Sequence, residues 1–160
     1  MRIRLTTELD CPKERAWQAV QTTRLLEYIA APLVRFDPLQ PSRLPETWVE
    51  GSYQVRMKIF GWFSFGKHWI VISVPQCREH LYQIRDNGHG DRISRWDHWI
   101  TIQDAPDGRT QYMDQVEIEA GLLTPVVWLF SQIFYRHRQR RWRNLVKQDF
   151  QYPVVMSGVH

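Results

Sequence analysis

The stretch TPVVWLFSQIFYRHRQRRWRNL, residues 124–145, predicts the longest helix of this 160-residue chain. Thr124 and Pro125 are typical of a helix N-cap and a first helical position, so we expect the helix to begin there and to continue to about Asp149. At about 3.6 residues per turn, one arc of this helix is apolar and consists of Val127, Phe130, Phe134, Tyr135, Trp142 and Leu145. An arc of this kind needs a partner surface to cover it.

The second half of the same helix carries the positive charge of the chain. The formal net charge is +4, from 21 Lys and Arg against 17 Asp and Glu. Five of the basic residues are Arg136, Arg138, Arg140, Arg141 and Arg143, and the rest of the chain is almost neutral. Nucleic-acid binders usually spread their basic residues over several elements, whereas these arginines alternate between the outer and inner faces of one helix. We therefore expect no nucleic-acid partner.

Two of these arginines, Arg138 and Arg141, fall within the apolar arc, where an unpaired guanidinium is costly. Three interpretations are open: pairing with an inward carboxylate, snorkelling of the side chain to the edge of the apolar surface, and pairing with the acidic group of a bound ligand. We favour the first two, because long cationic side chains commonly lie along apolar surface with their heads in water.

Alternation of apolar and polar residues predicts strands before the long helix. A strand at residues 2–9 is followed by two short helices. Cys11 and Pro12 mark the start of the first helix, and Thr22 or Thr23 caps the second. Six more strand patterns follow, at residues 33–36, 53–59, 68–74, 81–86, 93–102 and 110–120.

The turns between these strands predict a consecutive antiparallel meander. They include residues 61–66, 87–90 and 105–108, which contain Gly, Asn, Asp or Pro. The order of elements predicts an α+β fold, with a seven-stranded antiparallel sheet and the long helix on one of its faces. We expect residues 1–152 to form a single domain and residues 153–160 to form a flexible tail.

Missing motifs exclude several classes of protein. The start MRIRLTTELD has neither an apolar core nor a cleavage site, so we expect a cytoplasmic protein. The longest apolar stretch, residues 122–135, falls short of the ~20 residues of a membrane span. We expect Cys11 and Cys77 to be reduced thiols. No nucleotide-binding or metal-ligand spacing is present, so we expect no cofactor and no metal.

Polar side chains interrupt the inward side of the predicted sheet. The titratable ones are His68, Asp86, His98 and Asp114. We expect Ile100 to face Tyr112 on the neighbouring strand, a register that places His98 opposite Asp114. Two interpretations are open for these groups: hydrogen bonds within a packed core, or polar anchors in a ligand cavity with apolar walls.

Three segments resemble a known family: LPETWVEGSYQVRMKIFGWFSFGKHWIVIS (44–73), RWDHWITI (95–102) and AGLLTPVVWLFSQIFYRHRQRRWRNL (120–145). They are similar to the SRPBCC superfamily of START, polyketide cyclase and birch-pollen-allergen-like proteins, and the small, stand-alone bacterial members in particular. The resemblance covers about residues 2–150. It implies a helix-grip fold, in which a curved antiparallel sheet wraps around the long helix and encloses a hydrophobic cavity. It carries no catalytic residue over, because the superfamily has no universal catalytic set.

Three functional hypotheses follow. The first is a protein that binds a hydrophobic small molecule such as a lipid, sterol or polyketide in an internal cavity. The second is an enzyme of the polyketide cyclase or dehydratase kind, in which Asp114 polarises His98 as general base. The third is a protein that contacts a membrane surface or a partner through the C-terminal helix. The predicted ligand contacts are Tyr53, Val55, Met57, His68, Ile70, Tyr82, Trp96, His98, Tyr112, Asp114, Phe134, Arg138 and Arg141.

Overall fold

The structure, a computed structural model, describes residues 1–75 and 80–153. Its strands are β1 (Arg2–Leu9), β2 (Val34–Gln40), β3 (Gly51–Ile59), β4 (Phe63–Ser73), β5 (Leu81–Gly90), β6 (Arg95–Asp104) and β7 (Thr110–Glu119). Its helices are α1 (Lys13–Val20), α2 (Thr23–Ala30) and α3 (Thr124–Lys147), with short 3-10 turns η1 (Pro106–Gly108) and η2 (Gly121–Leu123). Cys77 and most of the predicted tail lie outside the described residues.

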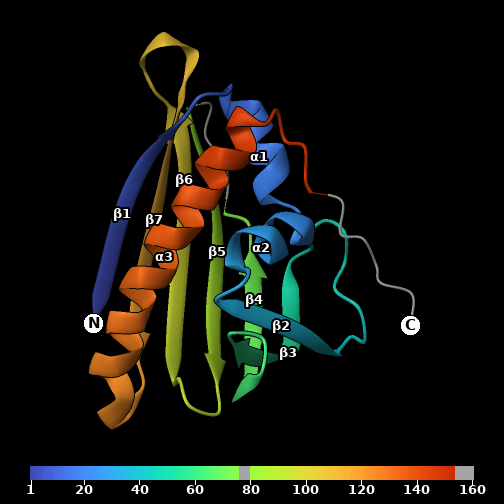
Figure 1. Ribbon diagram of the computed structural model, residues 1–160, viewed down its shortest axis with the longest axis vertical. Helices are drawn as coiled ribbons and strands as arrows, with labels where there is room; N and C mark the ends of the chain where they lie inside the picture. Colours follow the sequence, from blue (N-terminus) through green and yellow to red (C-terminus); the bar gives the residue numbers. More distant parts are fainter. Residues whose placement is uncertain (76–79, 154–160) are drawn as a thin grey trace.

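The strands form one seven-stranded antiparallel sheet in the order β1-β7-β6-β5-β4-β3-β2. Strands β2 to β7 are a meander, and β1 lies beside β7 at the far edge (Figure 1). The predicted number of strands, their antiparallel pairing and the two short helices after the first strand are confirmed.

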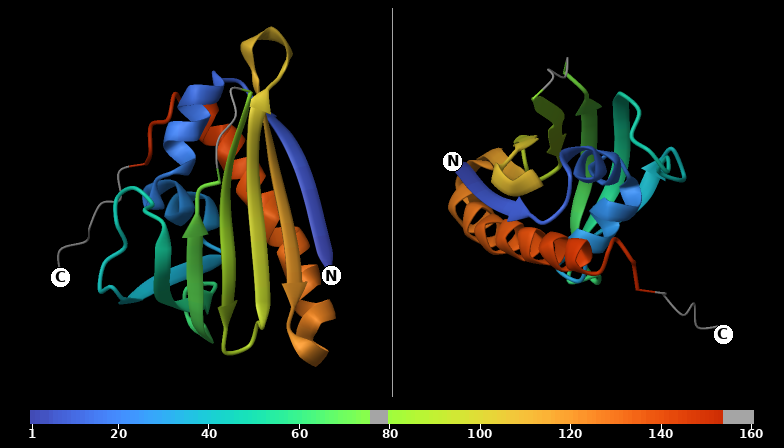
Figure 2. Two further views of the ribbon diagram at one scale, coloured as in Figure 1. Left: turned by 180° about the vertical axis from the view of Figure 1, so that it is seen from behind. Right: turned by 90° about the horizontal axis from the view of Figure 1, so that it is seen from above.

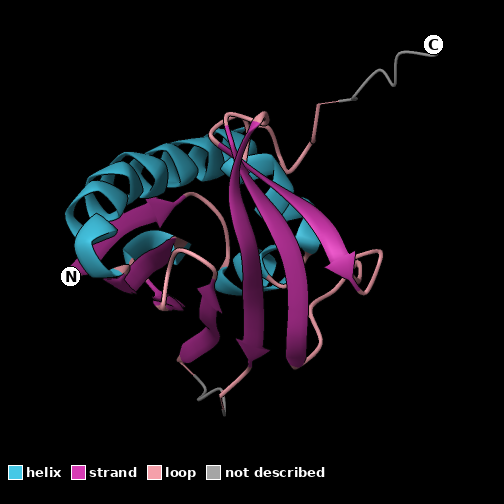
Figure 3. Cartoon of the chain, turned by 90° about the horizontal axis from the view of Figure 1, so that it is seen from below, coloured by secondary structure: helices cyan, strands magenta, loops and turns pink. Residues whose placement is uncertain are grey.

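Helix α3 lies across one face of the curved sheet (Figure 3). The view from behind in Figure 2 shows strands in front of α3, so no helix of the described residues covers the other face of the sheet. The main backbone contacts of α3 are with β1, β7 and α2. The helix therefore packs closely against the β1–β7 edge of the sheet. Away from this edge, α3 contacts α2.

Local sequence explains how the helices begin. Thr22 caps α2, because its hydroxyl accepts a hydrogen bond of 3.2 Å from the backbone N–H of Leu25. Helix α1 starts differently from the prediction: Pro12, not Cys11, stands at its N-cap. The hydroxyl of Thr124 accepts from the Ala120 N–H at 2.8 Å and so holds the segment before α3.

Several strand predictions differ from the structure. Strand β4 begins at Phe63, inside the predicted turn at residues 61–66, and β2 continues past the predicted residue 36 to Gln40. Residues 87–90 were predicted as a turn, but β5 runs through them to Gly90. Gly88 is required there by close approach, because a Cβ at this position would lie 2.8 Å from the backbone oxygen of Trp69. The predicted register of β6 and β7 is wrong by two residues: Ile102, not Ile100, pairs with Tyr112.

Because a slip of two residues preserves the side of the sheet on which each residue points, the predicted inward face is kept.

Within residues 1–75 and 80–153, no helix combines the length and the apolar character that crossing a bilayer requires.

Candidate functional site

A cavity of about 290 Å³ lies between the sheet and the helices α2 and α3. Its walls are mostly apolar and include Leu25, Ile29, Ile70, Ile84, Ile100 and Phe134. The space exists because α3 packs closely on β1 and β7 but not on the middle strands. Its volume is near the lower end of the range for small-molecule pockets, about 300–1,000 Å³. It can hold one small apolar molecule.

Four acidic or basic side chains face this cavity: His68 on β4, Asp86 on β5, His98 on β6 and Arg138 on α3. Asp86 and His98 are direct partners across the two strands. A Cβ at Gly88 would lie 2.8 Å from Nε2 of His68 and 3.2 Å from Oδ1 of Asp86, so these two groups converge over the same glycine. We call His68, Asp86, His98 and Arg138 the polar patch.

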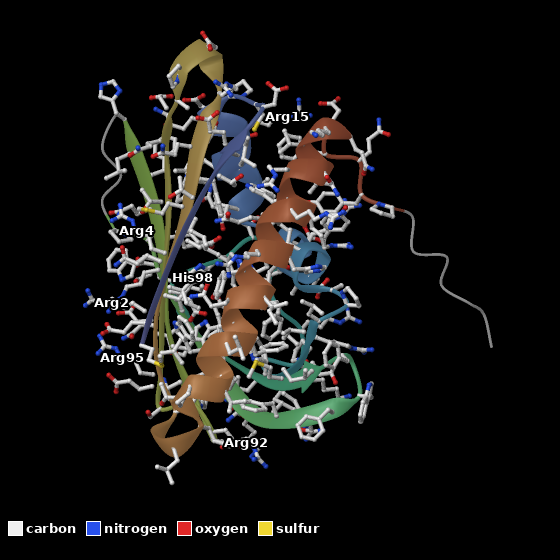
Figure 4. The ribbon with its side chains drawn as sticks, turned by 60° about the vertical axis from the view of Figure 1, so that its left-hand side comes forward. Arg2, Arg4, Arg15, Arg92, Arg95 and His98 are labelled. Atoms are coloured by element: carbon white, nitrogen blue, oxygen red, sulfur yellow. The ribbon has the colours of Figure 1, made fainter. Side chains whose placement is uncertain are left out.

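A buried carboxylate holds His98 from behind the cavity wall. Nε2 of His98 lies 2.8 Å from Oδ1 of Asp114, which also accepts a hydrogen bond of 2.8 Å from the Tyr112 hydroxyl. The side-chain amide of Gln139 donates to Oδ2 of Asp114 and to the carbonyl oxygen of Leu5, each at 3.0 Å. Both oxygens of this carboxylate therefore have donors, and the His98 ring is fixed in orientation. Figure 4 shows His98 near the middle of the molecule, beside α3.

Burial and hydrogen bonding set the charges of the His98–Asp114 pair. Burial acts to raise the pKa of Asp114, but its interactions with His98, the charge of Arg138 and the hydrogen bond from Gln139 together outweigh it, and the pKa is lowered. Burial and the nearby charge of Arg138 lower the pKa of His98 although Asp114 acts to raise it. Near neutral pH a neutral imidazole therefore donates its Nε2–H to a carboxylate. Nδ1 of His98 has no hydrogen-bond partner in the described part of the chain.

Arg138 is only 6% exposed and lies against the rings of Phe134 and Tyr135, with its guanidinium carbon 5.6 and 5.1 Å from their centroids. Its Nε is buried without a hydrogen-bond partner among the described residues. No carboxylate of residues 1–75 and 80–153 lies within ion-pair distance of this guanidinium. Burial acts to lower its pKa, but the charges of Tyr112, Tyr135 and Asp114 and a hydrogen bond with Tyr112 together outweigh burial, and the pKa is raised. Arg138 is therefore a buried cation.

The other two groups of the polar patch have shifted pKa values. Asp86 is enclosed by the fold but keeps accessible surface on the cavity side, and burial raises its pKa to about 7. One of its oxygens accepts a hydrogen bond of 2.8 Å from the backbone N–H of Val71. Burial lowers the pKa of His68 to about 4, so this imidazole is neutral at pH 7. Its Nδ1 is buried and has no partner among the described residues.

Comparison with known proteins identifies the fold of this chain but not its function. No protein-family model matches the chain, and no curated protein matches its sequence. A START superfamily protein from Mycobacterium smegmatis has a TM-score of 0.60 at 16% identity, over 92% of this chain and 97% of that chain. The AHSA1 protein from Silicibacter pomeroyi has a TM-score of 0.60 at 11% identity, over 93% and 99%.

The Zhui aromatase/cyclase from Streptomyces sp. R1128 has a TM-score of 0.57 at 12% identity, over 100% of this chain and 99% of that chain. The chain has an SRPBCC-type, helix-grip fold. The cavity between its sheet and its long helix is therefore in the place where the resemblance predicted one.

The helix-grip cavity brings together part of the predicted set of ligand contacts. Seven predicted residues line it, namely Met57, His68, Ile70, Trp96, His98, Phe134 and Arg138. Tyr112 and Asp114 lie behind the wall and act on it through His98. The two-residue difference in register makes Asp114 the diagonal neighbour of His98, and the pair is still in hydrogen-bond contact.

Three other predicted contacts pack elsewhere in the core. Tyr53 lies edge-on to Trp48 at 5.3 Å and donates its hydroxyl to the Val49 carbonyl. Val55 is fully buried in the same core cluster and does not line the cavity. Tyr82 packs against Trp17, with the ring centroids 5.2 Å apart. These three residues therefore do not line the cavity.

Arg141 also lies outside the cavity. Its Nε donates to the carbonyl oxygen of Tyr28 at 2.8 Å, and its guanidinium lies over the Tyr28 ring at 4.2 Å. This residue therefore ties α3 to α2. The favoured interpretation does not describe Arg138, which is buried without an ion pair in the described part of the chain. Arg141 is half-buried and pairs within the protein, with a carbonyl and a ring instead of a carboxylate.

Several wall residues were not predicted from the sequence. Asp86 was placed on the inward face but not among the ligand contacts, and α2 contributes Leu25 and Ile29 to the wall. The apolar face of α2, with its spacing of four residues, was a usable signal. The position of α2 over the sheet was not predictable, since it depends on contacts with α3.

Large apolar side chains are exposed at one end of the molecule. They are Phe60, Trp62 and Phe63 around the β3–β4 turn, and Leu122 and Val126 at the start of α3. Figures 1 and 4 show both segments at the same end. Phe63 and Val126 also line the cavity, so this apolar surface is continuous with the cavity wall.

Proposed function

We propose that this protein binds one hydrophobic small molecule, such as a lipid, sterol or polyketide, in the helix-grip cavity. The observation that carries the proposal is the mainly apolar space of about 290 Å³ with a few polar groups on its wall. A ligand that buries about 200 Å² of apolar surface there would gain about 5 kcal/mol before the costs of association. The similarity to a START superfamily protein and to an aromatase/cyclase supports the same class of ligand.

Binding is tested with fatty acids, sterols and polycyclic aromatic compounds, by native mass spectrometry and thermal unfolding. We expect a one-to-one complex and a rise in Tm with at least one class, because a ligand that binds only the folded state stabilises it. The matched control is Ile100→Phe, which adds volume at the cavity wall and should reduce binding. The proposal fails if no class binds, or if Ile100→Phe binds as tightly as the natural chain.

A second candidate is catalysis by a general base, and the position of His98 favours it. The imidazole lies on the cavity wall with Asp114 hydrogen-bonded at 2.8 Å on its far side. Such an arrangement orients an imidazole for proton transfer to a molecule in the cavity. The reaction class would be the cyclisation or dehydration of an enolisable substrate. His98→Gln should then abolish turnover of a bound polyketone while ligand affinity is retained, and unchanged turnover would exclude this role.

Membrane contact and a cytoplasmic location remain predictions. The exposed apolar side chains next to the cavity, Trp62 and Leu122 among them, support contact with a lipid surface. Co-sedimentation with anionic vesicles tests it. Trp62→Ser with Leu122→Ser should weaken sedimentation, and binding that does not change in this double variant would contradict the prediction.

A further inference from the structure

We infer that the cavity selects apolar molecules that carry an anionic oxygen group, such as a carboxylate, and that Arg138 binds this group. This inference rests on the proposed binding function and narrows its ligand class. The observation behind it is a cationic side chain that is buried, lines the cavity and lacks an acidic partner in the described part of the chain.

The hydrogen-bonding capacity of Arg138 is largely unused within the protein. A guanidinium has five N–H donors in a planar fork. The Nε–H is buried without an acceptor among residues 1–75 and 80–153, and Tyr112 acts on the guanidinium through a hydrogen bond. The rings of Phe134 and Tyr135 contact the guanidinium but accept no ordinary hydrogen bond. Leaving such donors unsatisfied in a buried site is costly, and a ligand with acceptor oxygens would remove that cost.

The two carboxylates near Arg138 are already engaged. Asp114 accepts from His98, Tyr112 and Gln139, so its oxygens are held on the far side of the wall. One oxygen of Asp86 is held by the Val71 N–H. Both carboxylates influence Arg138 through their charge, but neither comes within ion-pair distance. The fold therefore does not supply the acceptor pair that the guanidinium fork fits.

An anionic group fits this position better than a neutral carbonyl. A carboxylate accepts two parallel N–H bonds from a guanidinium, whereas a ketone or ester offers one carbonyl oxygen. The neighbouring imidazoles of His68 and His98 are neutral at pH 7, so they do not compete for the anion by charge. Asp86 does not exclude the anion, since burial raises its pKa to about 7 and it can take up a proton.

The experiment compares three probes with the same apolar chain: dodecanoate, methyl dodecanoate and dodecanol. Their affinities for the natural chain are measured by isothermal titration calorimetry at neutral pH. We expect dodecanoate to bind about ten- to a hundredfold more tightly than the other two, the range for a hydrogen bond to a charged group.

Two variants and one control assign this preference to Arg138. Arg138→Met removes the charge at similar length and should make the three affinities equal. Arg138→Lys keeps the charge without the planar fork of N–H donors and should leave a smaller preference for dodecanoate. This variant tests the inference if Arg138→Met does not fold. Arg140→Gln removes one exposed arginine from the same helix and should leave the preference unchanged.

Each outcome is decisive. Equal affinities for the three probes in the natural chain would overturn the inference but leave the proposed binding function standing. A preference for dodecanoate that survives in Arg138→Met would assign the anion site elsewhere and also overturn it. If no probe binds, and the wider set of hydrophobic compounds fails as well, the binding function itself falls.

Discussion

The polar groups on the two sides of the cavity wall differ in how fully they are hydrogen-bonded. On the β6–β7 side, Asp114 accepts three side-chain hydrogen bonds and fixes His98. The unsatisfied side consists of His68 on β4 and Arg138 on α3, which each keep a buried nitrogen without a partner among the described residues. A satisfied network stabilises one conformation, whereas unsatisfied groups cost stability unless something binds them. The first side therefore supports the fold, and the second is the candidate contact for a ligand.

The largest expected effect is a loss of stability on removal of Asp114, the common acceptor on the β6–β7 side. Asp114→Ala leaves the buried donors of His98, Tyr112 and Gln139 without their acceptor. We expect the free energy of unfolding to fall by about 3–5 kcal/mol, as when one partner of a buried pair is removed. Urea unfolding measures it. Glu119→Ala, at a 57% exposed side chain, is the control and should cost less than about 1 kcal/mol.

A smaller effect is expected at the glycine under the unsatisfied side. A methyl group at Gly88 would lie 2.8 Å from both Nε2 of His68 and the carbonyl oxygen of Trp69. Because the second contact is with backbone, Gly88→Ala should cost about 1–3 kcal/mol and displace the His68 ring. Thermal unfolding and the histidine NMR signals report both changes. Asn87→Ala, at the exposed neighbouring position, should change neither; equal behaviour of the two variants would mean that the strand accommodates the methyl group.

The pH dependence of stability separates the two titrating groups of the unsatisfied side. The pKa of His68 falls from 6.5 to about 4, so its contribution to stability is lost as the pH drops through this range. The pKa of Asp86 rises from 3.8 to about 7, so its contribution is lost as the pH increases through that range. The two slopes oppose each other between about pH 4 and pH 6.5.

Replacing either residue alone should reveal how the other one makes the stability depend on pH. In His68→Gln the free energy of unfolding should decline as the pH rises toward 7, whereas in Asp86→Asn it should increase over the same range. Urea unfolding at a series of pH values measures both. Identical pH profiles for the two variants would show that neither group titrates as its burial predicts.

The smallest effect separates the two inward arginines. Arg141 contacts Tyr28 on α2 and not the cavity, so Arg141→Gln should reduce stability by about 1 kcal/mol without changing ligand affinity. Arg138→Met should instead lower the affinity for dodecanoate. Calorimetric titration of the two variants side by side tests this, and a loss of affinity in Arg141→Gln would place it in the site.

Periodicity predicted the elements of this fold because it reports which side of each element is apolar. It did not predict the β6–β7 register, because residues 105–109 connect the paired Asp104 and Thr110 through a 3-10 turn. It also misread the end of β5, where glycine is present for close packing and not for a turn.

The candidate site was predictable in part for a related reason. His68 and His98 could be assigned to the inward face from alternation along single strands. Arg138 and Arg141 are three residues apart on one helix, and periodicity places both near the apolar arc. Only the position of α2 separates them, since its Tyr28 carbonyl takes Arg141 and leaves Arg138 to the cavity. Such a contact between distant segments has no signature in local sequence.

The double hydrogen bond of Gln139 has a consequence for biosynthesis. One amide group joins Leu5, near the start of the chain, to Asp114 on β7, and it belongs to the last helix. While residue 139 is still inside the ribosome, neither bond can form, even if every strand has already emerged. The hydrogen bonding of Asp114 is thus completed only after translation has passed through α3, and a chain truncated before residue 139 would lack both bonds of Gln139.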